Sequence, residues 1–310
     1  MSDANPSEKR SDQSGTSVVA QWPTFALLGL CYLMWALGTT IIPMFSGVLA
    51  IVIVALAVTL HSSLQHEIIH GHPFSSPRVN AALVFPAVAI LIPYLRFRDT
   101  HLAHHMDARL TDPYDDPETN YLDPKIWFAL PRTVRAVLTF NNTLAGRLLI
   151  GPMVSQVMFM RADWQAIRSG DRSVLFGWLW HIPAVLLVVA WLMWVGNMSM
   201  WSYAAAAYCG ISILKIRTFL EHQAHENANE RTVIIEDRGL LAYLFLNNNF
   251  HVVHHMHPAA AWNTLPRLYD ANRDRYLRRN NDYRYRSYLD VFRRYFLKAK
   301  DPVPHPLWPR

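Results

Sequence analysis

Histidines gather in three short clusters whose spacing suits metal binding. The clusters are His66 with His70, then His101 with His104 and His105, and finally His251 with His254 and His255. Residues three or four positions apart lie on one face of a helix, so each cluster can direct two imidazoles at one ion. In the second and third clusters, the two adjacent histidines can point toward two different ions. The pattern therefore predicts a site for more than one metal.

The number of imidazoles points the same way. The three clusters supply eight, and His222, which follows Glu221, adds a ninth. A catalytic zinc needs only three protein ligands and an open position. Nine imidazoles suit two metal ions with four or five nitrogen ligands each. Because imidazole binds iron, zinc, copper and nickel, the ligand type alone does not select the metal.

Taken alone, the first cluster has a second interpretation. His66, Glu67 and His70 match the His-Glu-x-x-His motif of zinc proteases, in which the glutamate is the general base. An intramembrane zinc metalloprotease would need these histidines and one more ligand, and it leaves the later clusters unexplained. We keep the protease as a remote alternative.

Uncharged apolar segments must position these histidines. Residues 22–43 and 45–64 are each long enough to cross about 30 Å of hydrocarbon, and a very short junction joins them into a hairpin. Residues 174–195 and 200–220 form a second hairpin. Residues 79–95 are fewer and include two prolines, so we expect an interfacial segment that keeps all the clusters on one side of the membrane.

The positions of the basic residues indicate the topology. Every Lys and Arg lies in the N-terminal tail, between Arg78 and Arg172, or from Lys215 onward, and neither hairpin loop carries one. By the positive-inside rule, both termini and all the histidine clusters face the cytoplasm. We expect an all-α integral membrane protein with four transmembrane helices, arranged as two hairpins, and a cytosolic helical cap that holds a His-rich di-metal site. We expect it in a bacterial inner membrane.

Composition agrees with this organisation and excludes other classes. Of 310 residues, 52% are hydrophobic, which is high for a soluble enzyme. The two cysteines, Cys31 and Cys209, allow neither a disulfide framework nor a cysteine-bound zinc or iron–sulfur site. The net charge of +6 comes without a recognition motif, so we expect no nucleic acid partner.

The chain divides into three parts by composition. We expect a disordered tail over residues 1–20, a membrane domain over 21–260, and a basic, aromatic cytosolic segment over 261–310. That last segment either contacts anionic headgroups or a redox partner, or forms a solvated surface of the cap. Residues 126–160 read as an amphipathic helix on the membrane surface. The acidic stretch 110–118 matches no ligand position, and we expect it to order a loop or to recognise an electron donor or a headgroup.

The three clusters resemble the histidine boxes of the membrane fatty acid desaturase and hydroxylase superfamily: His-x-x-x-His, then His-x-x-His-His twice. The likeness runs from about the first span to Pro258 and is closest to the acyl-lipid desaturase branch. The segment Thr218 to His222 (TFLEH) resembles that branch's Thr-Tyr-Leu-Gln-His segment. The third cluster, with the sequence HVVHH, resembles its His-Val-Ala-His-His box.

The resemblance implies a cofactor and its ligands. Two non-haem Fe2+ ions would be held by His66, His70, His101, His104, His105, His222, His251, His254 and His255. No catalytic residue is implied beyond these ligands. Supporting positions near the metals are expected for Glu67, His72, His225, Asn248 and His257.

The resemblance also implies the partners and the reaction. O2 is the co-substrate, the substrate is a membrane lipid or acyl chain, and electrons come from a separate ferredoxin or cytochrome-type donor, because no fused cytochrome b5 module is visible. The leading hypothesis is oxygen-dependent desaturation of a fatty acyl chain in lipid metabolism. The alternative is a di-iron hydroxylase or monooxygenase of an acyl, alkyl or other hydrophobic substrate. Substrate length, carrier, regioselectivity, donor identity and oligomeric state stay open.

Overall fold

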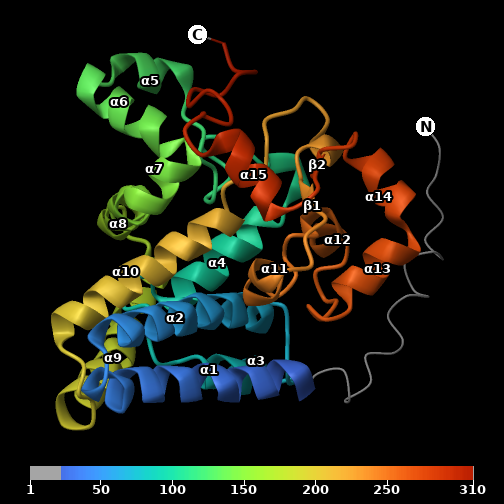
Figure 1. Ribbon diagram of the computed structural model, residues 1–310. Helices are drawn as coiled ribbons and strands as arrows, with labels where there is room; N and C mark the ends of the chain where they lie inside the picture. The colour runs from blue at the N-terminus through green and yellow to red at the C-terminus, as the bar shows by residue number, and fades with distance from the viewer. Residues whose placement is uncertain (1–21, 310) are drawn as a thin grey trace.

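The computed structural model describes residues 22–309 and is mostly helical (Figure 1). The tail expected over residues 1–20 lies outside the described residues. Long helices form one layer, and shorter helices and loops from the second half of the chain cover one end of it (Figure 1). The metal-site histidines lie where the two parts meet.

The first hairpin is close to its expected position. Helix α1 (Trp22–Thr40) and helix α2 (Gly47–Ile69) are joined by the 3-10 turn η3 (Ile42–Met44). Ser46 starts α2 by accepting a hydrogen bond from the backbone N–H of Leu49. Helix α2 continues beyond the expected end of the span at residue 64 and carries His66 in its last turn. The span and the first ligand cluster are therefore one rigid element.

The second hairpin consists of α9 (Arg172–Trp194) and α10 (Met200–Arg217). Among residues 22–309, three segments are long and apolar enough to cross a membrane, namely Trp22–Met44, Gly47–Ile69 and Arg172–Trp194. Helix α10 packs along α2 but ends in Lys215 and Arg217. The structure thus shows three candidate spans, and α10 as a fourth span stays a prediction.

Helices α2 and α10 approach each other closely at Gly210. A Cβ atom at Gly210 would lie 2.7 Å from the carbonyl oxygen of Ala55 and from the Cβ of Val58, so glycine is required at this contact. The Thr59 hydroxyl donates across the same contact to the Gly210 carbonyl at 2.9 Å. This contact fixes α10 against the helix that carries the first histidine cluster.

Residues 79–95 do not form one helix. Helix α3 (Pro77–Leu83) is followed by irregular backbone until α4 (Tyr94–His104) begins. Neighbouring side chains satisfy that backbone: the Tyr203 hydroxyl donates to the Val88 carbonyl at 2.7 Å, and His181 Nε2 lies 2.6 Å from the Ile90 carbonyl. Irregular backbone among apolar helices needs such partners. His181 therefore has a structural role.

Helix α4 is tied to the second half of the fold by a buried carboxylate. Arg96 donates two hydrogen bonds of 2.9 Å to Asp163, and the indole N–H of Trp178 donates a third, also 2.9 Å. These residues belong to α4, α8 and α9. Their contacts fix the helix that carries His101 and His104.

The expectation of a single surface helix over residues 126–160 is wrong. The segment forms α5 (Pro124–Ala129), α6 (Arg132–Asn141), α7 (Leu144–Leu149) and α8 (Gly151–Arg168). Pro131 separates α5 from α6, and the Thr143 side chain caps α7 by accepting from the N–H of Gly146. These local breaks override the continuous amphipathic pattern. Helix α8 nevertheless exposes apolar side chains, including those of Met153, Val157 and Trp164.

The remaining elements build the cap over the histidines. They are η4 (Asp107–Arg109), η5 (Ala228–Glu230), β1 (Ile234–Ile235), α11 (Leu240–Leu244), α12 (His251–Met256), α13 (Leu265–Ala271), α14 (Arg273–Arg279), β2 (Arg284–Tyr285) and α15 (Tyr288–Tyr295). Strands β1 and β2 pair in parallel, so the all-α expectation is wrong for these four residues. The pairing joins the segment before α12 to the C-terminal segment.

Most aromatic residues beyond position 260 are buried or partly buried, whereas Phe296 is exposed. Tyr285 and Tyr288 pack with Phe219 and Phe245, while Tyr269 packs with Phe250. Their burial explains why aromatic and basic residues alternate here: the rings face the core of the cap while most of the arginines remain at the surface. Residues 261–309 thus contribute to the same cap that holds α12.

Candidate metal centre

The nine histidines converge into two adjacent groups. Group one consists of His66, His70, His101, His105 and His254, and group two consists of His104, His222, His251 and His255. Within each group, the ring nitrogens that face one another all lie within 4.8 Å. Sequence reasoning predicted nine ligands for two metals, and the structure brings these same nine side chains together.

Helical spacing divides the clusters between the two groups. In α4 and its C-terminal cap, His101 and His105 join group one, whereas His104, between them, joins group two. In α12, His251 and His255 join group two, while His254 joins group one. Each cluster of three thus serves both groups. The two groups are held together by the helices themselves.

The distances between ring nitrogens fit metal coordination. In group one, His101 Nε2 lies 3.0 Å from both His70 Nε2 and His105 Nε2. Two ligands at right angles around an ion, with metal–nitrogen bonds of about 2.1 Å, lie about 3.0 Å apart. Hydrogen bonds alone do not account for this arrangement, because buried His66 Nε2 has no hydrogen-bond partner among the described residues.

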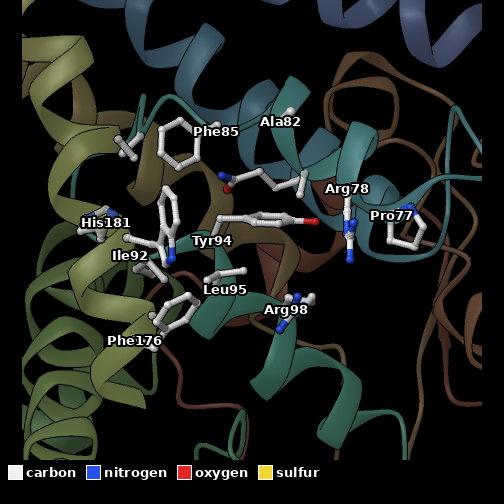
Figure 2. A pocket seen from close by; sticks show the side chains of 16 residues that line it. Pro77, Arg78, Ala82, Phe85, Ile92, Tyr94, Leu95, Arg98, Phe176 and His181 are labelled. Atoms are coloured by element: carbon white, nitrogen blue, oxygen red, sulfur yellow. The ribbon is translucent and has the colours of Figure 1, made fainter. Parts of the chain in front are cut away.

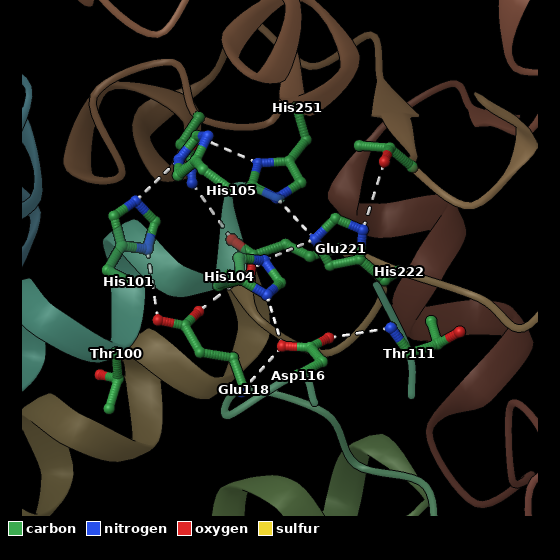
Figure 3. Close-up of polar contacts among 12 residues, drawn as sticks. Thr100, His101, His104, His105, Thr111, Asp116, Glu118, Glu221, His222 and His251 are labelled. Atoms are coloured by element: carbon green, nitrogen blue, oxygen red, sulfur yellow. Dashed lines mark hydrogen bonds and ion pairs between the residues drawn. The ribbon is translucent and has the colours of Figure 1, made fainter. Parts of the chain in front are cut away.

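Group two shows the same geometry. His222 Nε2 lies 2.9 Å from His104 Nε2 and 3.1 Å from His251 Nε2 (Figure 3). Four nitrogen donors leave room around an ion for a further ligand, as a catalytic site requires. The donor set of both groups therefore fits a pair of transition metal ions, including iron.

Two carboxylates after the second cluster orient the ligand rings. His104 Nδ1 lies 2.8 Å from Asp116 Oδ1, and His101 Nδ1 lies 3.2 Å from Glu118 Oε1 (Figure 3). A ring that donates through Nδ1–H presents an unprotonated Nε2 to a metal. Asp116 and Glu118 were not predicted individually. The acidic stretch 110–118 was the signal, but only folding shows which of its carboxylates face histidines.

Asn248 supports group two. Its side-chain oxygen lies 3.1 Å from His251 Nδ1, and its side-chain nitrogen donates to Glu221 Oε1 at 3.1 Å. Glu221 also pairs with Arg217 at 3.2 Å. Asn248 therefore links a ligand ring to a buried charge network, as expected for a supporting residue.

The other expected supporting residues have different neighbours. Glu67 accepts a hydrogen bond of 3.1 Å from the N–H of Trp262, and His72 Nε2 lies 3.2 Å from the Ala259 carbonyl. His257 Nε2 lies 3.1 Å from the Tyr276 hydroxyl. His225 is half-buried and pairs with Glu230 at 3.4 Å. Glu67 and His72 thus fasten the end of α2 to the cap, and His225 contacts a neighbouring loop.

Burial keeps most of the rings in the neutral form that binds metal. Burial lowers the pKa of His70 to about 3, and nearby imidazoles act in the same direction. Burial and adjacent rings also lower the pKa values of His222 and His251. For His104, burial lowers the pKa, but the carboxylates of Glu118 and Asp116 outweigh it and raise the pKa to about 9. A metal that enters group two must therefore displace a proton from His104.

Comparisons with known proteins support this chemistry. A family model for fatty acid desaturases matches residues 40–287, a range that contains all nine histidines. The chain is also similar to a beta-carotene ketolase from Paracoccus sp. (strain N81106 / MBIC 01143), with 26% identity over 223 residues, which cover 69% of this chain and 73% of the relative. The match is to a family of oxidoreductases that act with O2. Because the matched range runs from the end of α1 through both imidazole groups to most of the cap, the chain belongs to the fatty acid desaturase family.

Proposed function

We propose that the two imidazole groups hold two non-haem Fe2+ ions and that the protein uses them with O2 to desaturate a fatty acyl chain. The observation that carries this proposal is the division of nine buried or half-buried imidazoles into two adjacent groups. The bound irons would supply the oxygen activation that lets an unactivated C–H bond react.

The protein's own residues have three tasks in this proposal. Imidazoles from α2, α4 and α12 hold the ions, while Asp116 and Glu118 keep two of the rings in the correct tautomer. The cap covers the site, and His66, His101, His104, His251 and His254 are buried. Burial keeps bulk water away from the oxidant, so that oxidation is directed to the substrate.

A second candidate is hydroxylation or another oxygenation of a hydrophobic substrate. The similar protein named a beta-carotene ketolase supports this candidate. After a first hydrogen has been removed, loss of a second from the neighbouring carbon gives a double bond, whereas oxygen transfer gives a hydroxyl group, which a second round of oxidation at the same carbon converts to a carbonyl group. The two outcomes need the same ligands, so the substrate must be examined to separate them.

The membrane topology and the electron donor are also part of the proposed function. We infer an integral membrane protein with four spans, with α10 as the fourth, and with both termini on the cytoplasmic side of a bacterial inner membrane. The distribution of Lys and Arg and the three candidate spans support this arrangement. Electrons would come from a separate ferredoxin or cytochrome-type donor on the cytoplasmic side.

Expression in a host that lacks desaturases tests the reaction. Total lipids are compared by mass spectrometry between cells with the wild-type chain and cells with His222→Ala. We expect acyl chains that have lost two hydrogen atoms in wild-type cells alone. Chains or other lipids that have gained an oxygen atom would select the second candidate, and unchanged lipids would contradict both.

A further inference from the structure

An apolar cavity lies beside the two helices that carry the first ligands. Its volume is about 760 Å³, within the range of sites that enclose small ligands. Helices α3, α4 and α9 and the irregular segment after α3 form most of its walls. Phe85, Ile92, Phe176 and Trp180 are among the apolar lining residues (Figure 2). The cavity can therefore hold a hydrocarbon chain.

Two contacts place the cavity near group one. Gln65 lines it and is adjacent in sequence to the ligand His66. Arg98 also lines it and lies three residues before His101 on α4, which is about one helical turn of 5.4 Å. On both α2 and α4, a residue that lines the cavity therefore lies within one helical turn of a histidine of group one.

One end of the cavity is polar and positively charged. Figure 2 shows Arg78 just beyond the Tyr94 hydroxyl and Arg98 below Tyr94 at this end, with Phe85 and His181 toward the opposite end. The two arginines are the charged lining residues, and among the described residues no carboxylate lines the cavity. The cavity therefore has an apolar end and a cationic end.

The donors at the cationic end are available to a ligand. Among residues 22–309, neither the Arg78 guanidinium nor the Tyr94 hydroxyl has a hydrogen-bond partner. Arg98 donates hydrogen bonds from Nε and Nη2 to Asp99, and its side chain is 42% exposed. By contrast, His181 at the other end already binds the Ile90 carbonyl. An unpaired guanidinium and an unpaired hydroxyl beside an apolar cavity are typical of a site that recognises a head group.

We propose that this cavity binds a single-chain amphiphile with an anionic head, and that Arg78, Arg98 and Tyr94 hold that head while the chain lies along the apolar walls. The head is a carboxylate or a phosphate, either of which accepts hydrogen bonds from guanidinium groups. That the bound chain is the oxidised substrate rests on the proposed function, whereas the binding preference does not. The proposal separates this chain's ligand from a neutral carotenoid, which has no anionic head.

Binding to the full-length protein in detergent tests the proposal without any turnover. The probes are chain-brominated analogues of hexadecanoate, hexadecanol and hexadecanoyl lysophosphatidate, whose bromine quenches the fluorescence of Trp180. Trp180→Phe shows how much of the signal comes from the cavity. We expect the better of the two anionic probes to bind about 10-fold or more tightly than the alcohol.

Variants then locate the preference. Arg78→Gln should remove most of the difference between the anionic probe and the alcohol, and Arg78→Lys should keep part of it. Arg168→Gln, an exposed arginine at the end of α8, is the matched control and should change nothing. Ala82→Trp fills the cavity and should weaken all three probes.

Each outcome has one meaning. Tighter binding of the carboxylate than of the phosphate identifies a fatty acid as the ligand, and the reverse order identifies a phospholipid, and either supports the proposal. Equal binding of the alcohol and both anions, or an unchanged preference in Arg78→Gln, would overturn it. Selective binding without any oxidised lipid would remove the proposed function and leave this inference standing.

Discussion

The loop after the second histidine cluster decides how individual ligands are presented. Asp116 Oδ1 lies 2.8 Å from His104 Nδ1, in group two, and the side chains of both residues are 2% exposed. Glu118 lies 3.2 Å from His101 Nδ1, in group one, and its other oxygen is 3.9 Å from His104 Nε2. One short loop therefore acts on both groups.

Replacing Glu118 tests whether a hydrogen bond to His101 supports metal binding. Glu118→Leu removes the acceptor and should lower iron affinity about 10- to 100-fold. Glu118→Gln keeps an oxygen acceptor without the charge and should lose less. Affinity is measured by competition with a chelator, and Asp115→Asn, an exposed carboxylate of the same loop, is the control. Equal affinities in Glu118→Leu and the wild type would show that the ring needs no such partner.

At this scale, sequence alone predicted which nine histidines come together, but not all of their partners. Histidine spacing in short helices is a local property, so the assignment of adjacent rings to different ions follows from it. Asp116 and Glu118 contact histidines 12 and 17 residues away, through a loop whose path depends on tertiary contacts. Asn248 could be predicted because it lies in sequence only three residues before His251.

Among the elements, the contact between α2 and α10 fixes the base of the site. Gly210→Ala places a methyl group 2.7 Å from Ala55 and Val58, so the helices must separate. Overpacking of this kind costs about 1–3 kcal/mol, and we expect a lower Tm of the detergent-solubilised protein together with weaker iron retention. Gly29→Ala on α1 has no neighbouring atom within 4 Å and should leave both unchanged. An unaltered Tm in Gly210→Ala would show that the contact can relax without cost.

Elements whose character is set locally were predicted more closely than those set by tertiary contacts. The hairpins follow from uncharged runs of membrane length. Helices α1, α9 and α10 begin and end within about three residues of the expected segments, whereas α2 ends five residues beyond its segment. The four helices α5 to α8 were missed because an amphipathic pattern continues through Pro131 and Thr143. The C-terminal aromatics gave no sign of which residues they would pack against, and neither did the pairing of β1 with β2.

For the whole molecule, the central question is which side of the membrane each part faces. We expect the loop between α9 and α10 to face away from the cytoplasm and the cap to face it. In a Cys209→Ser background, Asn197→Cys should react with an impermeant thiol reagent in intact cells. Asp282→Cys, exposed in the cap, should react only after the membrane is opened. Labelling of Asp282→Cys in intact cells would contradict the cytoplasmic cap.

The claim on which the whole account depends is that two separate groups each hold one iron. Metal analysis of the purified protein tests it directly. We expect about two irons per chain in the wild type. We expect about one iron when His70 and His254 of group one are both changed to Ala, and also about one when His222 and His251 of group two are both changed to Ala. Glu67→Ala, which removes no imidazole, should keep about two. One zinc per chain in the wild type, unaffected by changes in group two, would contradict the account.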